Sequence, residues 1–456
     1  MKNKKNILIL LFNTIFIVLI IIVLCCQQAS DSSGGGSKGG SGKKEESPWS
    51  TQLLGVIGVY TDAYGITSDL NGNVYTTGNT IGNLDGETLT GTRDLFVVKY
   101  NSAGVKQWTR LLGAAGVYTE ARGITSDLSG NVYTTGFTEG NLDGHILTGT
   151  RDLFVVKYDS SGNKLWTRLL GVTGKSTTAR GTTSDSSSNV YTTGYTNGNL
   201  DGKTLTGTVD LFVVKYDSSG NKLWTRLLGV TGAYTYAYGI TSDLNGNVYT
   251  TGFTEGNLDG KTLTGIVDLF VVKYDPSGNK LWTRLLGASG AFTYARGITS
   301  DLSGNVYTTG YIEGGFLDGQ TLTGLSDLFV VKYDSNGNKF WTRLLGVAGV
   351  YTDAYGITSD LSGNVYMTGW TNGNLDEHIL TGIRDLFVVK YDSSGNNLWT
   401  ELLGVAGAET NANGITSDLN GNVYTTGWTK GNLDGQTLTG LSDLFVVKYN
   451  SNGVRQ

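Results

Sequence analysis

A unit of 58 residues recurs seven times along this chain of 456 residues, and that repeat constrains the fold more than any other feature. One interval is 59 residues long, because of an insertion at Gly314 to Phe316. Self-similarity at such a period is typical of propellers, solenoids and repeat arrays. The string Asp-Leu-Phe-Val-Val-Lys-Tyr marks each copy, starting at Asp94, Asp152, Asp210, Asp268, Asp327, Asp385 and Asp443.

One unit, which starts near Tyr238, reads as four short strands rich in Val, Thr, Tyr and Trp. Tight turns with the Asp, Asn and Gly chemistry of hairpins join the first strand to the second and the third to the fourth. A longer loop, residues 255–267, joins the second to the third. Four strands per repeat predict one propeller blade. The expected strands span residues 239–243, 248–253, 269–274 and 281–286.

The chain starts within a unit, at the strand of Trp49, and stops within one, after Gly453. The two fragments add up to one blade, which predicts a ring closed by the N-terminal strand, because an open solenoid needs atypical capping units. The expected fold class is therefore all-β, a seven-bladed β-propeller with four strands per blade over residues 48–456. The recurring pattern Ala-x-Gly-Ile-x-x-Asp-x-x-Gly-Asn-Val-Tyr-x-Thr-Gly resembles the bacterial seven-bladed β-propeller repeat family, which implies this fold and no common activity.

The first 26 residues read as an export signal. Three lysines precede an apolar run from Ile7 to Leu24, as in a signal peptide. The end of the run resembles a bacterial lipoprotein signal, in which Val23 and Cys25 hold the aliphatic and small positions before an acylated Cys26. An uncleaved signal anchor is the alternative, because the run approaches the length of a membrane-spanning helix. Both place the body outside the cytoplasm, on the outer-membrane, periplasmic or cell-surface side.

Composition narrows the partners. Residues 27–47, rich in Gly, Ser, Lys and Glu, predict a flexible tether, and a lipid-anchored monomer is expected. The formal net charge is −5 and becomes more negative without the leading lysines, so no nucleic-acid partner is expected. No metal or other cofactor is expected either, because the body has no cysteine and its only histidines, His145 and His378, lie too far around the ring to share one site.

Differences between the units indicate where a ligand could bind. The tight turns barely vary, whereas the longer loops, which share the opposite face, do. Trp370 and Trp428 follow the Thr-Gly of the second strand in adjacent units, stand apart from the other five units and are the expected anchor pair. Aromatic and arginine side chains are typical of recognition surfaces, and drift in permissive loops is the alternative. One variable position, expected to ring the channel mouth, holds Tyr64, Arg122, Arg180, Tyr238, Arg296, Tyr355 and Asn413.

These features favour a non-enzymatic binding module, displayed at the cell envelope, that takes a protein or glycan ligand through the loop face of the propeller. The alternative is an extracytoplasmic enzyme, glycan-active or quinone-dependent, with a site at the propeller mouth. The binding module is favoured because no acid/base pair or activated nucleophile stands out in any unit. No catalytic residue is therefore assigned.

Overall fold

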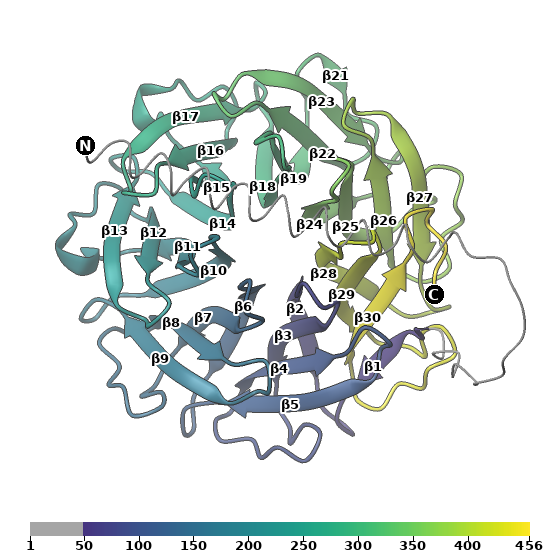
Figure 1. Cartoon of the computed structure of the whole chain (residues 1–456). Coiled ribbons are helices and arrows are strands. Elements are labelled where there is room, and N and C mark those ends of the chain that lie inside the picture. The colour runs from purple at the N-terminus through teal and green to yellow at the C-terminus, as the bar shows by residue number, and fades with distance from the viewer. Residues whose placement is uncertain (1–48) are drawn as a thin grey trace, which may run out of the picture. The chain divides into compact units, whose positions relative to one another are not determined.

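Seven four-stranded antiparallel sheets surround a central channel in the computed structural model, which describes residues 49–456 (Figure 1). In blade 1 the strands run from the channel outward as β2 (Thr61–Ser68), β3 (Val74–Thr80), β4 (Asp94–Tyr100) and β5 (Lys106–Leu112). The predicted seven-bladed propeller is confirmed. The signal peptide (1–26), the tether (27–47) and the lipid site at Cys26 lie outside the described residues.

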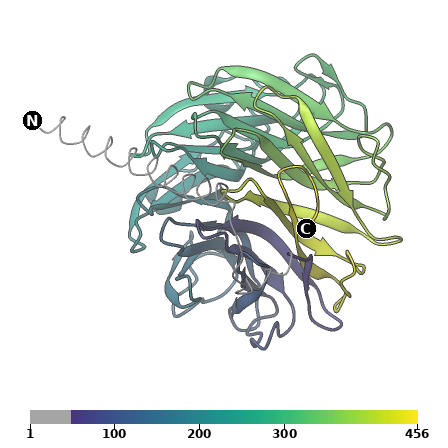
Figure 2. The ribbon, with the colours of Figure 1, turned by 45° about the vertical axis from the view of Figure 1, so that its right-hand side comes forward.

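The next three blades repeat this order, and Figure 2 shows their sheets twisted about the ring. Blade 2 contains β6 (Thr119–Ser126), β7 (Val132–Thr138), β8 (Asp152–Tyr158) and β9 (Lys164–Leu170). Blade 3 contains β10 (Thr177–Ser184), β11 (Val190–Thr196), β12 (Asp210–Tyr216) and β13 (Lys222–Leu228). Blade 4 contains β14 (Thr235–Ser242), β15 (Val248–Thr254), β16 (Asp268–Tyr274) and β17 (Lys280–Leu286).

Blade 5 carries the insertion, which forms a two-stranded ribbon of β20 (Phe316–Leu317) and β21 (Gln320–Thr321). Its main strands are β18 (Phe292–Ser300), β19 (Val306–Glu313), β22 (Ser326–Tyr333) and β23 (Lys339–Leu345). Blade 6 contains β24 (Thr352–Ser359), β25 (Val365–Thr371), β26 (Asp385–Tyr391) and β27 (Asn397–Leu403). The described helices are single 3-10 turns, η1 (Leu200–Gly202) and η2 (Leu258–Gly260). Across residues 49–456, no helix has the length and apolar character needed to cross a membrane.

Blade 7 combines the two ends of the described chain. Its inner strands are β28 (Thr410–Ser417), β29 (Val423–Thr429) and β30 (Asp443–Tyr449). The outer strand is β1 (Gln52–Leu54), which pairs antiparallel with β30, with Leu54 opposite Leu444. Figure 1 shows this purple strand beside the yellow one. The predicted closure of the ring by the N-terminal strand is confirmed.

The hydrophobic core lies between neighbouring blades. One cluster joins Leu95 and Val97 of blade 1 to Phe154 and Val156 of blade 2. The tryptophan of each outer strand takes part in one of these clusters. The indole N–H of Trp108, for example, donates to the carbonyl of Ser160 in the next blade, at 3.2 Å. Each third strand is thus buried on both faces, which explains its nearly continuous apolar sequence.

A closed belt of hydrogen bonds links the innermost strands at the end nearest the tight turns. The hydroxyl of each strand's last serine donates to the carbonyl of the equivalent serine in the preceding blade, at 2.8 to 3.0 Å. Seven such side-chain-to-backbone bonds close the circle, so they help core packing to fix the radius of the channel. The members are Ser68, Ser126, Ser184, Ser242, Ser300, Ser359 and Ser417.

The innermost strands begin earlier than the sequence predicts. In blade 4 the expected strand was 239–243, whereas β14 spans Thr235–Ser242. A β-bulge explains the difference: Ala237 pairs with Gly252 and Gly239 with Thr251, which leaves Tyr238 unpaired between them. A bulge bends the strand locally and re-aims a side chain. The same irregularity occurs in the innermost strand of every blade.

Candidate functional site

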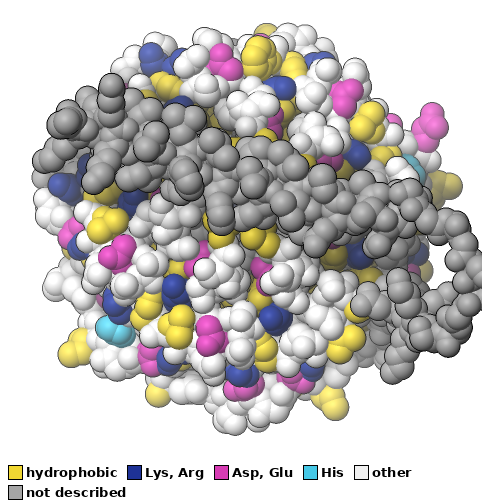
Figure 3. Space-filling view, in the orientation of Figure 1, with side chains coloured by type: hydrophobic (Ala, Val, Ile, Leu, Met, Phe, Trp, Pro, Cys, Tyr) yellow, Lys and Arg dark blue, Asp and Glu magenta, His cyan; other side chains and the backbone are white. Residues whose placement is uncertain are grey.

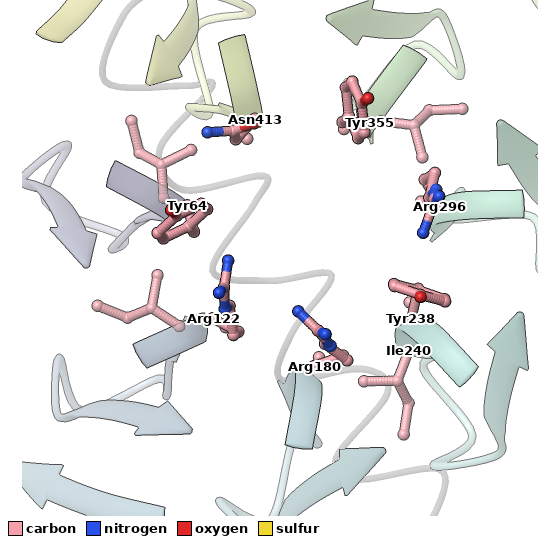
Figure 4. Close-up of a pocket in the computed structure, with 18 of the residues that line it drawn as sticks. Tyr64, Arg122, Arg180, Tyr238, Ile240, Arg296, Tyr355 and Asn413 are labelled. Atoms are coloured by element: carbon pink, nitrogen blue, oxygen red, sulfur yellow. The ribbon is translucent and has the colours of Figure 1, made fainter. Parts of the chain in front are cut away.

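The seven bulged residues line one central cavity of about 370 Å³. Figure 4 shows their side chains around the opening. The volume falls within the range of ligand pockets, about 300–1,000 Å³. We call these residues the channel ring. Six are residues that the sequence predicted for the ligand face, with Asn413 as the seventh: Tyr64, Arg122, Arg180, Tyr238, Arg296 and Tyr355.

Below the channel ring the wall becomes apolar. Two residues further along each strand, toward the tight turns, six blades carry a buried isoleucine and blade 3 carries Thr182. The polar groups of the cavity are therefore concentrated on the side of the longer loops. The isoleucines are Ile66, Ile124, Ile240, Ile298, Ile357 and Ile415.

In blades 1 and 2 the arginine charge is partly neutralised within the protein, because two guanidinium groups share one carboxylate. The buried carboxylate of Glu120 accepts hydrogen bonds from the guanidinium groups of Arg93 and Arg122. The Cζ atom of Arg122 also lies 4.1 Å from the centroid of the Tyr64 ring. Such a buried, doubly paired carboxylate holds both arginines in place. Both guanidinium groups of this sector thus have an ion-pair partner within the protein.

Arg180 and Arg296, in blades 3 and 5, have a different environment. Each donates a hydrogen bond from Nη2 to a tyrosine hydroxyl of its own blade, Arg180 to Tyr195 at 2.8 Å and Arg296 to Tyr311 at 2.9 Å. Between residues 49 and 456 no carboxylate forms an ion pair with either guanidinium. Their positive charges are therefore directed into the channel without a bound counter-charge.

Besides Glu120 of blade 2, two further carboxylates stand two residues before the channel ring, in blades 1 and 6. Burial raises the pKa of Asp353 to about 6, although the Ser326 hydroxyl donates to it. Burial also raises the pKa of Asp62, which accepts a hydrogen bond from Ser442. Both acids are thus held by neighbouring hydroxyls at the channel mouth, and Asp353 changes charge close to neutral pH.

Aromatic side chains form a continuous band over blades 3 to 6. Neighbouring rings have centroids 4.7 to 6.4 Å apart, a spacing typical of interacting aromatic pairs. Most of these rings are only half-buried. We call this band the aromatic arc; its members are Tyr195, Tyr236, Phe253, Tyr294, Tyr311 and Tyr355.

Trp370 and Trp428 do not line the cavity but lie one strand further out, on β25 and β29. The indole N–H of Trp370 donates to the Tyr355 hydroxyl at 3.4 Å, and the Arg384 guanidinium lies 4.2 Å from its ring centroid. Lys430 approaches the Trp428 ring to 5.2 Å. Among the described ring contacts none joins the two indoles, so the expected anchor pair consists of two separate side chains.

The register shows that both tryptophans belong to a series present in every blade. The same second-strand position is aromatic in six of the seven blades, and only blade 1 departs, with Asn79. The two tryptophans therefore differ from the aromatic residues at this position in the other blades in size rather than in kind. The remaining members are Phe137, Tyr195, Phe253 and Tyr311.

Further aromatic residues of the loop face were not predicted. Four residues before the channel ring, four blades expose a tyrosine with 38 to 47% of its surface accessible. Comparing the repeats at this position would have found them. Figure 3 shows hydrophobic and oppositely charged side chains interspersed on the visible face, without a field of one sign. The exposed tyrosines are Tyr60, Tyr118, Tyr234 and Tyr351.

The groups around the channel mouth define the chemistry that this site offers. The side chains offer ring faces, phenol hydroxyls and guanidinium groups. Over the described part of the chain, no group of three or more His, Cys, Asp or Glu side chains could hold a metal ion. His145 and His378 lie in the loops of blades 2 and 6, where each pairs with a leucine three residues earlier.

Comparison with known families matches the repeats directly. The model of a family described as the beta-propeller repeat matches once in each of the seven units. The matched segments together make up more than half of the chain. The matched segments are residues 49–85, 107–143, 165–201, 223–259, 281–316, 341–376 and 398–434.

This chain belongs to the beta-propeller repeat family. A curated relative is an uncharacterized WD repeat-containing protein, L264, of Acanthamoeba polyphaga mimivirus, which is 26% identical over 361 residues. The match covers 61% of this chain and 26% of that protein, so the chain spans about a quarter of its relative's length.

Solved structures show similarity at low sequence identity. A protein of unknown function from Bacteroides caccae is 12% identical with a TM-score of 0.35, over 65% of this chain and 94% of that one. The WD40 beta propeller domain of Doa1 is 10% identical with a TM-score of 0.46, over 87% and 96%. A fungal alcohol oxidase of the AA5 family, in complex with copper, is 12% identical with a TM-score of 0.45, over 89% and 77%.

Proposed function

We propose that this propeller is a non-enzymatic binding module that takes a protein or glycan ligand on the loop face, around the channel mouth. The observation that carries the proposal is the concentration of differences between near-identical blades at this mouth. Away from the mouth the blades carry near-identical residues, because they pack in the same way, as in the third strands. The mouth instead holds half-buried tyrosines, tryptophans and arginines, which are the side chains that dominate binding energies in interfaces.

The proposed location follows from the sequence of the N-terminal region. The charged start, the apolar run and the cysteine pair support export and a lipid anchor on Cys26. We propose that the protein acts as a monomer at the membrane, outside the cytoplasm and without a nucleic-acid partner. The tether of residues 27–47 gives the loop face freedom to meet its ligand.

Acylation is expected at Cys26, because Val23 and Cys25 then occupy the positions that a lipoprotein signal requires before the modified residue. Metabolic labelling with a radioactive fatty acid should tag the wild-type protein and fail to tag Cys26→Ala. Cys25→Ala is the matched control, since alanine also suits the small position and labelling should persist. Label that survives Cys26→Ala and disappears with Cys25→Ala would shift the lipid site by one residue.

The location of the ligand is tested by the two tryptophans. For any partner returned by a binding screen, Trp370→Ala combined with Trp428→Ala is expected to lower affinity by more than ~1 kcal/mol, because truncating an aromatic side chain in an interface removes contact area. The measurement is calorimetric titration of the partner into each variant, with the melting temperature as a check on folding.

Two controls report on other surfaces. Asn245→Ala alters an exposed side chain of a tight turn, and Phe340→Ala removes a ring that is 60% exposed on the outer strand β23. Both should leave the affinity almost unchanged. If the controls weaken binding as much as the tryptophan variant, the ligand does not meet the loop face.

A further inference from the structure

The channel ring carries more positive charge than its surroundings neutralise. Three of its seven members are arginines, and no Asp or Glu lines the cavity. Arg122 shares the Glu120 carboxylate with Arg93, but neither Arg180 nor Arg296 has an ion-pair partner within the described chain. A guanidinium stays protonated at every physiological pH. Two full positive charges therefore face the channel without a counter-ion from the protein.

Both of these arginines also have unused hydrogen-bonding capacity. Each donates from Nη2 to a tyrosine hydroxyl, and neither Nη1 has an acceptor among the described residues, whereas the Nε atoms are buried and closed to an outside ligand. Asp353 interacts electrostatically with Arg296 but forms no ion pair with it. Its carboxylate accepts a hydrogen bond from the Ser326 hydroxyl instead. Buried donors are normally paired, because an unpaired one is destabilising. The channel thus offers donors that an acceptor from outside could satisfy.

The two guanidinium groups flank a single aromatic ring. The Cζ atoms of Arg180 and Arg296 lie 5.5 and 4.3 Å from the ring centroid of Tyr238, which belongs to the blade between theirs. Figure 4 shows the three side chains next to one another at one side of the opening. On the same blades the aromatic arc continues outward through Tyr236 and Tyr294. Positive charge and ring faces are therefore combined in one sector.

We infer that blades 3 to 5 bind an acidic glycan, whose carboxylate or sulfate groups lie between Arg180 and Arg296 while its sugar rings rest on the aromatic arc. The inference rests on the proposed binding function and names the ligand class for that site. The planar guanidinium fork matches carboxylate and sulfate oxygens in two-point hydrogen bonds. No Asp or Glu lines the cavity, and the carboxylates next to the channel ring, Asp62, Glu120 and Asp353, belong to blades 1, 2 and 6 rather than to blades 3 to 5.

The aromatic arc favours a saccharide as the carrier of the charge. A tyrosine ring combines an apolar face with a hydroxyl edge. A sugar ring has the complementary make-up, since C–H groups form its faces and hydroxyl groups its edges. Five of the six arc members are tyrosines. The hydroxyls of Tyr195, Tyr311 and Tyr355 already accept a hydrogen bond from the protein, so each of them offers a ligand its own proton. An acidic peptide would use the arginines but would leave these hydroxyls without a regular partner.

The test is calorimetric titration of the full-length protein with three acidic tetrasaccharides: galacturonate, mannuronate and chondroitin sulfate. At least one is expected to bind, and the methyl ester of a bound uronate, which keeps the sugar and loses the charge, should bind at least tenfold more weakly. The double variant Arg180→Met/Arg296→Met should lower the affinity for the acidic saccharide by about tenfold or more for each guanidinium removed. The same variant should leave the affinity for the ester almost unchanged.

Matched variants show whether a loss of affinity comes from the lost positive charge or from a folding defect. Lys203→Met/Lys261→Met removes the same net charge from exposed loop positions of blades 3 and 4 and should bind like the wild type. Arg180→Lys/Arg296→Lys keeps the charge without the planar fork and should bind with intermediate affinity. It serves as the folded reference if the methionine variant loses its melting transition.

Several outcomes would overturn the inference. Failure of all three acids to bind would do so, as would equal binding of acid and ester, or unchanged affinity in the arginine variants. Binding of a hexaglutamate peptide, with none of the saccharides bound, would assign the arginines to an acidic protein partner instead. In each of these cases the proposed function still holds if some other partner binds the wild type and binds the Trp370→Ala/Trp428→Ala variant more weakly. A partner insensitive to both sets of variants would remove the proposed function as well.

Discussion

Removing Trp49 to Leu54 is expected to open the propeller ring and to leave an aggregation-prone protein. These residues supply the outer strand of blade 7 through β1, whose partner β30 would otherwise expose a full strand edge. Unpaired edges are sites of association between chains. Trp49 is 4% exposed and packs at 5.1 Å on Tyr424 of blade 7 and at 6.3 Å on Tyr100 of blade 1, so it joins the last blade to the first.

The expected loss is a large fraction of the total stability. Truncating a buried tryptophan alone costs about 3–5 kcal/mol. The free energy of unfolding of a domain is about 5–15 kcal/mol. The deletion also removes the backbone pairing of Gln52 with Val446 and of Leu54 with Leu444. Thermal unfolding and light scattering check the prediction: the melting temperature should fall sharply and the particle mass should rise.

A transposed variant provides the control. In the complete blades the outer strand follows directly from the second tight turn, and here the C-terminal residue Gln456 already bonds to Lys448 of β30. Arg455 and Thr51 both contact Asp434 from the two halves of this strand. Moving residues 49–54 to follow Gln456 should therefore restore the melting temperature. A deletion variant that stays monomeric and melts like the wild type would contradict the closure argument.

The sequence repeat makes most of the fold predictable, because units of nearly identical sequence form the same strands and pack on one another in the same way. Trp49 can be assigned to the last blade from the sequence, since the Trp and Leu-Leu-Gly around it match the outer strand of every other unit. The bulge at Tyr238 is not visible in this way. It shifts the register within the strand without changing the period, so β14 begins before the expected residue.

The channel ring is predictable as a set of positions, but its charge balance is not. The sequence places Arg122, Arg180 and Arg296 at one repeated position and treats them alike. The structure separates them, because Glu120 reaches Arg93 of the neighbouring blade as well as Arg122. Such pairing depends on side-chain direction across two blades, which a repeat pattern does not encode. The free arginines could be recognised only after that pairing was known.

Gly287→Ala is expected to destabilise the protein strongly, because no space exists for the added methyl group. A Cβ at Gly287 would lie 1.8 Å from Oδ1 of Asp268. That carboxylate is fully buried and accepts the backbone N–H groups of Thr264 and Gly265, each at 2.7 Å. The seven aspartates that open the third strands all make this pair of bonds to the preceding loop.

The added methyl group must therefore expel the carboxylate or shift the strand. Expulsion leaves two half-buried N–H groups without their acceptor, at up to about 1–3 kcal/mol for each. Gly290→Ala is the matched control, because a Cβ there meets nothing within 4 Å and only the left-handed backbone, with φ of 73°, opposes it. Alanine in that conformation costs about 1–2 kcal/mol. Urea unfolding should thus show a clearly larger loss for Gly287→Ala than for Gly290→Ala.

A double variant distinguishes steric conflict from a general intolerance of blade 4. Asp268→Ala alone orphans the same two N–H groups, and it also creates the space that the Cβ of residue 287 needs. The combination with Gly287→Ala should therefore be about as stable as Asp268→Ala alone, so that the two single effects do not add. Full additivity would mean that the glycine is required for another reason, such as the backbone path into β18, and that the aspartate and the glycine do not form one packing unit.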